Sequence, residues 1–142
     1  MKLRTAVLAL LSLISLSLRA ETISYTVNNY WQFRRADAPE DVWTTVNIPH
    51  TWNALDTDDD VPGYYRGKGI YRKVMDIPRN ADGKRGYLLF EGDGQVCDVL
   101  VDGVKAASHL GAYSAFVADI TGFVTAGKSC EVTVIADNSH DP

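Results

Sequence analysis

Residues 96–107 read Val-Cys-Asp-Val-Leu-Val-Asp-Gly-Val-Lys-Ala-Ala, and this stretch decides the class of fold. The side chains alternate over residues 96–101, so that Cys97, Val99 and Val101 share one face of an extended strand. Asp102-Gly103 is a two-residue sequence that a type I′ hairpin turn favours. The stretch therefore predicts a β-hairpin with one buried face.

The same period of two recurs along most of the chain. Short apolar runs are bounded by Gly, Asp and Pro, and no window of a dozen residues carries a hydrophobic stripe of helical period. Beyond the hairpin, the expected strands cover residues 31–33, 43–48, 70–77, 85–91, 114–120 and 130–136. Many short strands separated by turns are typical of a β-sandwich or jelly roll, so we expect an all-β fold.

Residues 1–20 have the form of an export signal. Lys2 and Arg4 precede an apolar run over residues 6–18, and Arg19-Ala20 supplies the small residue before a cleavage site. The apolar run is too short to span a bilayer easily, and no second apolar segment follows it. We expect an exported bacterial protein, periplasmic or secreted, with no membrane span.

Removal of this signal leaves residues 21–142, enough for about one domain. These residues carry 11 basic and 18 acidic side chains, a net charge of −7 with no basic run. Such a charge makes nucleic-acid binding improbable. A (β/α)₈ barrel needs about 250 residues, so the chain cannot contain one.

The two cysteines, Cys97 and Cys130, allow two interpretations. In an exported protein a pair of cysteines can form a disulfide. Each also occupies an inward-facing position of an alternating strand, where Cys behaves as a small hydrophobic residue. The sequence leaves the disulfide open.

The sequence contains no convincing metal or cofactor motif. Residues 56–60 (Asp-Thr-Asp-Asp-Asp) would need Gly and Glu at the sixth and twelfth positions of an EF-hand loop, where Val61 and Gly67 stand. A looser cation site on this loop stays open, although a solvated acidic loop is the default. Gly92-Asp-Gly94 precedes a strand rather than a helix, so it is a turn and not a dinucleotide fingerprint. We expect no cofactor and no metal.

Four acids in apolar surroundings are the candidates for acid–base chemistry: Glu91, Asp98, Asp119 and Glu131. A glycosidase needs two positioned carboxylates. Glu91 could serve as a general acid, but it is better explained as a strand-end residue bonded to the backbone of the turn. No serine lies in a Gly-x-Ser-x-Gly elbow. The sequence therefore assigns no catalytic residue.

The stretch from residue 49 to residue 68 is the least regular, and long loops inside compact β domains are often functional. Aromatic rings that can stack on sugar C–H faces combine here with side chains that can bond hydroxyls. The set comprises Trp43, His50, Trp52, Asn53, Asp56, Tyr64, Tyr65 and Arg66. Trp43 is better explained as a packing residue beneath the loop. Taken alone, this composition indicates a carbohydrate face only weakly.

These same residues carry a resemblance to a known family. The matching segments are Trp43-x-x-Val46-x-Ile48-Pro49-His50-Thr51-Trp52-Asn53, Tyr65–Lys73, Leu89–Gly92, Gln95–Gly103, His109–Phe116, Asp119–Thr121 and Val132–Asn138. Their order and content resemble the amino-terminal sugar-binding domain of glycoside hydrolase family 2, the family of β-galactosidases, β-glucuronidases and β-mannosidases. The likeness covers nearly all of residues 21–142.

The resemblance implies a jelly-roll, galactose-binding-like β-sandwich that precedes an immunoglobulin-like domain and a TIM barrel. In that family two glutamates of the barrel hydrolyse O-glycosidic bonds with retention of configuration, so the resemblance implies that the catalytic residues lie outside these 142 residues. The domain usually continues beyond the segment matched by residues 132–138 into closing strands. We therefore expect residues 21–142 to be incomplete at the carboxyl end, a fragment inactive by itself.

The family's amino-terminal domain lends a loop to the rim of the active site. The matching loop here is His50–Arg66. The resemblance thus makes His50, Asn53 and Asp56 candidate contacts to a sugar hydroxyl of a β-glycoside or oligosaccharide, with β-galactosidase-like activity expected for the full-length enzyme. Two rival interpretations stay open: a free-standing carbohydrate-binding module, and a secreted interaction sandwich with no role in sugar binding.

Overall fold

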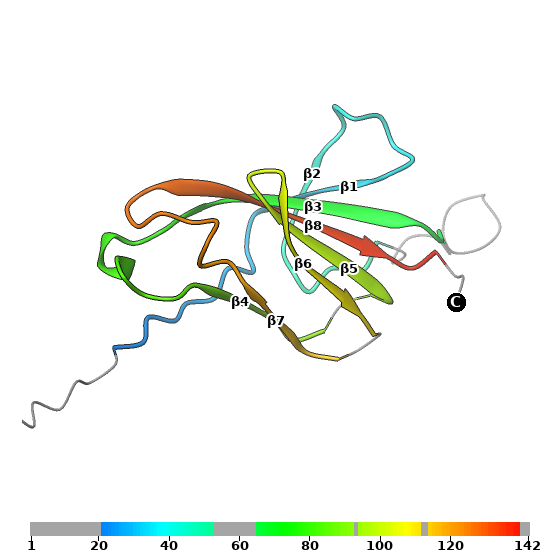
Figure 1. The fold of residues 1–142 in the computed structure, drawn as a ribbon. Coiled ribbons are helices and arrows are strands. Elements are labelled where there is room, and N and C mark those ends of the chain that lie inside the picture. The colour runs from blue at the N-terminus through cyan, green and yellow to red at the C-terminus, as the bar shows by residue number, and fades with distance from the viewer. Residues whose placement is uncertain (1–20, 53–64, 93, 112–113, 140–142) are drawn as a thin grey trace, which may run out of the picture.

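The computed structural model describes residues 21–52, 65–92, 94–111 and 114–139, which form two antiparallel β-sheets (Figure 1). One sheet has six strands in the order β2-β1-β3-β8-β5-β6, and the other pairs β4 with β7. In chain order the elements are β1 (Trp31–Arg35), β2 (Thr44–Val46), β3 (Lys68–Asp76), the 3-10 turn η1 (Arg79–Ala81), β4 (Tyr87–Phe90), β5 (Val96–Val101), β6 (Val104–Leu110), β7 (Phe116–Asp119) and β8 (Ser129–Asp137). The prediction of an all-β sandwich is confirmed.

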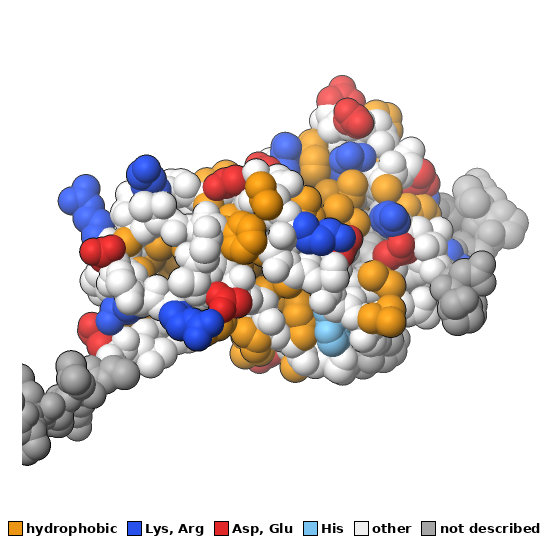
Figure 2. Space-filling model, in the orientation of Figure 1, with side chains coloured by type: hydrophobic (Ala, Val, Ile, Leu, Met, Phe, Trp, Pro, Cys, Tyr) orange, Lys and Arg blue, Asp and Glu red, His pale blue; other side chains and the backbone are white. Residues whose placement is uncertain are grey.

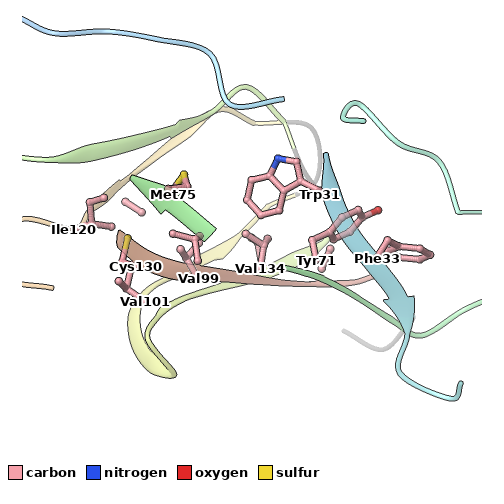
Figure 3. Close-up of a cluster of buried hydrophobic side chains, with 13 residues drawn as sticks. Trp31, Phe33, Tyr71, Met75, Val99, Val101, Ile120, Cys130 and Val134 are labelled. Carbon is pink, nitrogen blue, oxygen red and sulfur yellow. The ribbon is translucent and has the colours of Figure 1, made fainter. Parts of the chain in front are cut away.

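The core lies between the two sheets and follows the period-two pattern. Along β8 the buried residues alternate strictly from Cys130 to Ala136, and β5 buries every second residue in the same way. Figure 3 shows the labelled core side chains spread along the sheet, with Ile120 at one end of the cluster and Phe33 at the other. Hydrophobic residues of the smaller sheet, among them Leu88 and Phe116, pack against this cluster. Among the described residues, no buried residue is polar or charged.

The predicted hairpin forms as expected. Asp102 and Gly103 have φ angles of 48° and 79°, the left-handed values that a type I′ turn requires at both central positions. The Asp102 carboxylate also accepts a hydrogen bond from the backbone N–H of Glu131 at 2.8 Å. Since Glu131 lies on β8, this bond ties the turn to the neighbouring strand.

No disulfide joins the two cysteines. Cys97 pairs in register with Ala136 of β8, six residues along that strand from Cys130. Six residues of a β-strand span roughly 20 Å, whereas a disulfide needs Cα atoms less than about 7 Å apart. Both side chains are buried in the core, so each serves there as a small hydrophobic residue.

The described surface mixes both signs of charge. Figure 2 shows Lys and Arg side chains interspersed with Asp and Glu on the face that carries β5 and β6. Among the residues that the structure describes, no helix is long and apolar enough to cross a membrane.

Candidate functional site

An aromatic cluster forms where the chain leaves β2 and passes under the six-stranded sheet. Phe33 of β1 and Tyr71 of β3 are partners in register, with ring centroids 4.8 Å apart. The His50 ring meets Phe33 edge-on at 4.7 Å, and Trp52 lies parallel to Phe33 at 6.1 Å. Four rings from three separate segments thus fix the path of residues 50–52. The Ile48–Pro49 peptide bond just before them is cis.

The period-two pattern of β3 explains why the cluster forms here. Gly69, Tyr71 and Met75 are buried on the inner face of the strand. Gly69 leaves room for the Trp52 indole, because a Cβ atom at position 69 would lie 2.6 Å from that ring. The absence of a side chain at Gly69 therefore allows the Trp52 indole to pack directly against β3.

His50 has a defined hydrogen bond and an altered acidity. Its Nδ1 atom forms a hydrogen bond with the Tyr71 hydroxyl at 3.0 Å. Burial lowers the pKa of the imidazole below its ordinary value, because desolvation disfavours the charged form. A neutral ring with Nδ1 engaged has Nε2 left to form one hydrogen bond with a ligand hydroxyl.

A second set of contacts holds the opposite flank of the segment between residues 52 and 65. Asn138, just after β8, accepts a hydrogen bond from Gly67 N at 2.8 Å and donates its own backbone N–H to Gly67 O at 3.1 Å. Its amide also donates to Tyr65 O at 3.4 Å. The Arg35 guanidinium lies over the Tyr65 ring at 3.7 Å. Both flanks are therefore anchored at the beginning of β3.

The structure places only part of the predicted binding set. His50 lies in the aromatic cluster, whereas Asn53 and Asp56 lie outside the described residues. The acidic run over residues 56–60 also lies outside them. Sequence reasoning gave no role to Tyr71 or Asn138. Alternation along residues 69–75 could have indicated that Tyr71 faces inward, but nothing local indicated the contacts of Asn138.

Trp43 lies apart from the aromatic cluster and has a packing role. Its indole N–H donates to Glu40 O at 2.9 Å, and the Arg72 guanidinium covers its ring at 3.8 Å. Arg72 follows Tyr71 on β3, so its side chain lies on the outer face of the sheet. The Trp43 ring thus attaches the loop after β1 to this outer face.

The four acids considered for catalysis are dispersed over the fold. Asp98 on β5 accepts hydrogen bonds from Lys105 and Ser108, and these bonds lower the pKa of its carboxyl. Asp119 ends β7 and accepts a hydrogen bond from Arg85, two residues before β4. Glu91 is exposed immediately after β4, and Glu131 lies on β8. Among the described residues no group of three His, Cys, Asp or Glu side chains could hold a metal ion.

Comparison with known families gives the context for this geometry. Residues 14–141 match the model of the "Glycosyl hydrolases family 2, sugar binding domain". This match covers most of the chain. The chain belongs to glycoside hydrolase family 2.

Named relatives within family 2 agree with this assignment. The chain is 37% identical over 130 residues to a β-glucuronidase of Bacteroides fragilis, which covers 92% of this chain and 19% of that protein. It is 30% identical over 115 residues to a β-galactosidase of Thermoanaerobacter pseudethanolicus, which covers 81% of this chain and 15% of that protein. The crystal structure of a Bacteroides uniformis β-glucuronidase superimposes with a TM-score of 0.71 at 27% identity, covering 82% of this chain and 15% of that one.

The chain spans 12–19% of the length of the curated family 2 relatives that it matches. The matched part in each is a sandwich-sized region of a much longer polypeptide. Family 2 membership therefore applies to this region, which contains the aromatic cluster and the Asn138 contacts.

Proposed function

We propose that this chain is the sugar-binding part of an exported family 2 glycoside hydrolase that cleaves β-galactosides with retention of configuration. The observation that carries the proposal is the anchoring of both flanks of residues 53–64 at one end of the sheet. The aromatic cluster holds one flank and Asn138 holds the other. Such anchoring fits a segment that forms one wall of a sugar site.

In this proposal the roles of the residues are limited and specific. His50 offers Nε2 to a sugar hydroxyl, while Tyr71 fixes the orientation of its ring. Asn53 and Asp56 supply further hydroxyl contacts. Retaining hydrolysis needs two carboxyl groups about 5 Å apart, and these would be supplied by another part of the enzyme. The 142 residues alone are expected to be inactive.

A second candidate substrate is a β-glucuronide, because several of the similar proteins carry the name β-glucuronidase. The protein purified from its native host would be assayed with 4-nitrophenyl β-D-galactoside and 4-nitrophenyl β-D-glucuronide, and its intact mass measured. A polypeptide several times longer than 142 residues with β-galactosidase activity supports the proposal. Preference for the glucuronide would identify a β-glucuronide as the substrate and leave the proposed retaining mechanism unchanged.

A polypeptide that matches residues 21–142 and lacks both activities would contradict the proposed enzyme. Saccharide titration would then separate the two rivals: binding by this product supports a free-standing carbohydrate-binding module, and absence of binding supports an interaction sandwich. In an active enzyme, Asp56→Ala should raise KM, with exposed Asp82→Ala as the control. An unchanged KM would remove Asp56 from the site.

A further inference from the structure

Tyr30 is a bulky residue with a backbone conformation that such residues rarely adopt. It immediately precedes β1 and has a φ angle of 58°, in the left-handed region that bulky residues rarely adopt. Its side chain is 76% exposed, so core packing does not account for a tyrosine there. Backbone strain of this kind persists where neighbouring contacts hold it, and it is frequent at functional sites.

The contacts around Tyr30 hold its backbone firmly. Its N–H donates to the Asn47 side-chain oxygen at 2.9 Å, and Ile48 N donates to Asn28 O at 2.8 Å. The following residue, Trp31, is buried and pairs with Val46. The tyrosine ring is thus presented to solvent from a backbone position fixed on both sides.

Residues with polar groups suited to hydroxyl recognition lie next to Tyr30. Asn29 precedes Tyr30 in the chain, and the Asn47 side chain bonds the Tyr30 backbone. Both asparagines are exposed, and the Lys73 ammonium donates to Asn29 O at 2.7 Å. The Asn47 oxygen accepts from Tyr30 N, which leaves its NH₂ group to donate elsewhere. An exposed ring with asparagine amides on neighbouring residues is suited to a pyranose, which has an apolar C–H face and a rim of hydroxyls.

We propose that Tyr30, with Asn29 and Asn47, forms a second saccharide contact for a β-linked pyranoside, separate from the aromatic cluster around His50. Phe33 of that cluster lies three residues further along β1, roughly 10 Å from Tyr30. The contact rests on the proposed role of this chain in sugar binding, and it adds a distal position for an oligosaccharide.

The test is a titration of the full chain with β-1,4-galactotetraose and with a chondroitin tetrasaccharide, which contains glucuronic acid. Tyr30→Gly removes the ring and relieves the left-handed strain, so its melting temperature should equal or exceed that of the wild type. Its affinity should nevertheless fall at least tenfold for the oligosaccharide that binds. Tyr30→Phe should bind like the wild type, and NMR signals of the Tyr30 and Asn29 amides should shift on titration.

The matched control is Tyr25→Ala, since Tyr25 is also exposed, at 56%, and its hydroxyl contacts Asp76 O at 3.5 Å. The inference is overturned if Tyr30→Gly binds within twofold of the wild type, if Tyr25→Ala loses as much affinity, or if neither oligosaccharide binds the wild type. Hydrolysis by the whole enzyme is measured separately. A Tyr30→Gly enzyme that keeps both hydrolysis and oligosaccharide affinity therefore rejects this contact and leaves the proposed function intact.

Discussion

The Trp52 indole lies against the backbone of Gly69, so closely that a Cβ atom at position 69 would come within 2.6 Å of the ring. One glycine on β3 thus decides where the segment after β2 packs on the sheet. It also allows the stacking of Trp52 with Phe33, because the indole reaches that ring across the position where a side chain would stand.

Gly69→Ala should destabilise the fold by about 1–3 kcal/mol, because the added methyl group overpacks a rigid ring contact. The measurement is urea unfolding of the full chain, followed by tryptophan fluorescence. Gly92→Ala is the control, because a Cβ atom at that position meets nothing within 4 Å. Equal stability of the Gly69 variant and the wild type would show that Trp52 does not pack there in solution.

Asn138→Ala should weaken the attachment of residues 65–67 to the end of β8. The substitution removes both side-chain hydrogen bonds, to Gly67 N and Tyr65 O, at a cost of about 1–3 kcal/mol. Asn138→Asp keeps the acceptor for Gly67 N and should lose less stability than the alanine variant. Chemical denaturation would rank the three proteins, and an alanine variant as stable as the wild type would contradict the prediction.

Gly103→Ala should cost about 1–2 kcal/mol, because its φ of 79° is unfavourable for any residue with a Cβ atom. Gly122→Ala has open space and no left-handed φ, so it tests whether methyl addition alone matters. Thermal unfolding of both variants checks the prediction. A larger loss at position 122 than at 103 would reject the type I′ turn as the cause.

The Asp119 carboxyl should contribute a pH-dependent stability. Hydrogen bonds from Thr121, and then from Arg85, lower its pKa to about 2. Because the folded pKa lies below the unfolded value, the stabilisation is present above about pH 4 and is lost as the pH falls through 2. Asp119→Asn should therefore be less stable than the wild type at pH 7, and the difference should shrink between pH 4 and pH 2. A constant difference across that range, measured by urea unfolding, would contradict the assignment.

His50 should make the folded chain more stable as the pH rises, whereas a histidine in an ion pair makes a protein less stable as the pH rises. Burial lowers its pKa in the folded state, so the unfolded chain binds more protons just below its ordinary pKa. Stability should therefore rise with pH up to about 6.5 and then level off. His50→Asn, which can still bond Tyr71, should flatten this rise, whereas His109→Asn should retain it. Identical profiles for the wild type and His50→Asn would exclude His50 as the source.

Local sequence patterns predicted all eight strands with shifts of a few residues at their ends. The Asp102-Gly103 turn was identifiable because its two residues have a local conformational preference that few other pairs share. The candidate site was less predictable. His50 was identified from composition and resemblance, but its contact with Tyr71 joins segments 21 residues apart, and Asn138 contacts Gly67 across 71 residues. No local pattern encodes such contacts.

The two cysteines show which features follow from the local sequence and which depend on the tertiary structure. Alternation in residues 96–101 and 130–136 determines that Cys97 and Cys130 both face inward, because successive side chains of a strand point to opposite faces. Whether they can bond depends on which strands are neighbours and in what register. Only the pairing of β5 with β8 settles this, by placing Cys97 opposite Ala136 and well away from Cys130. Alternation is a property of each strand alone, whereas register is fixed by the packing of the whole sheet.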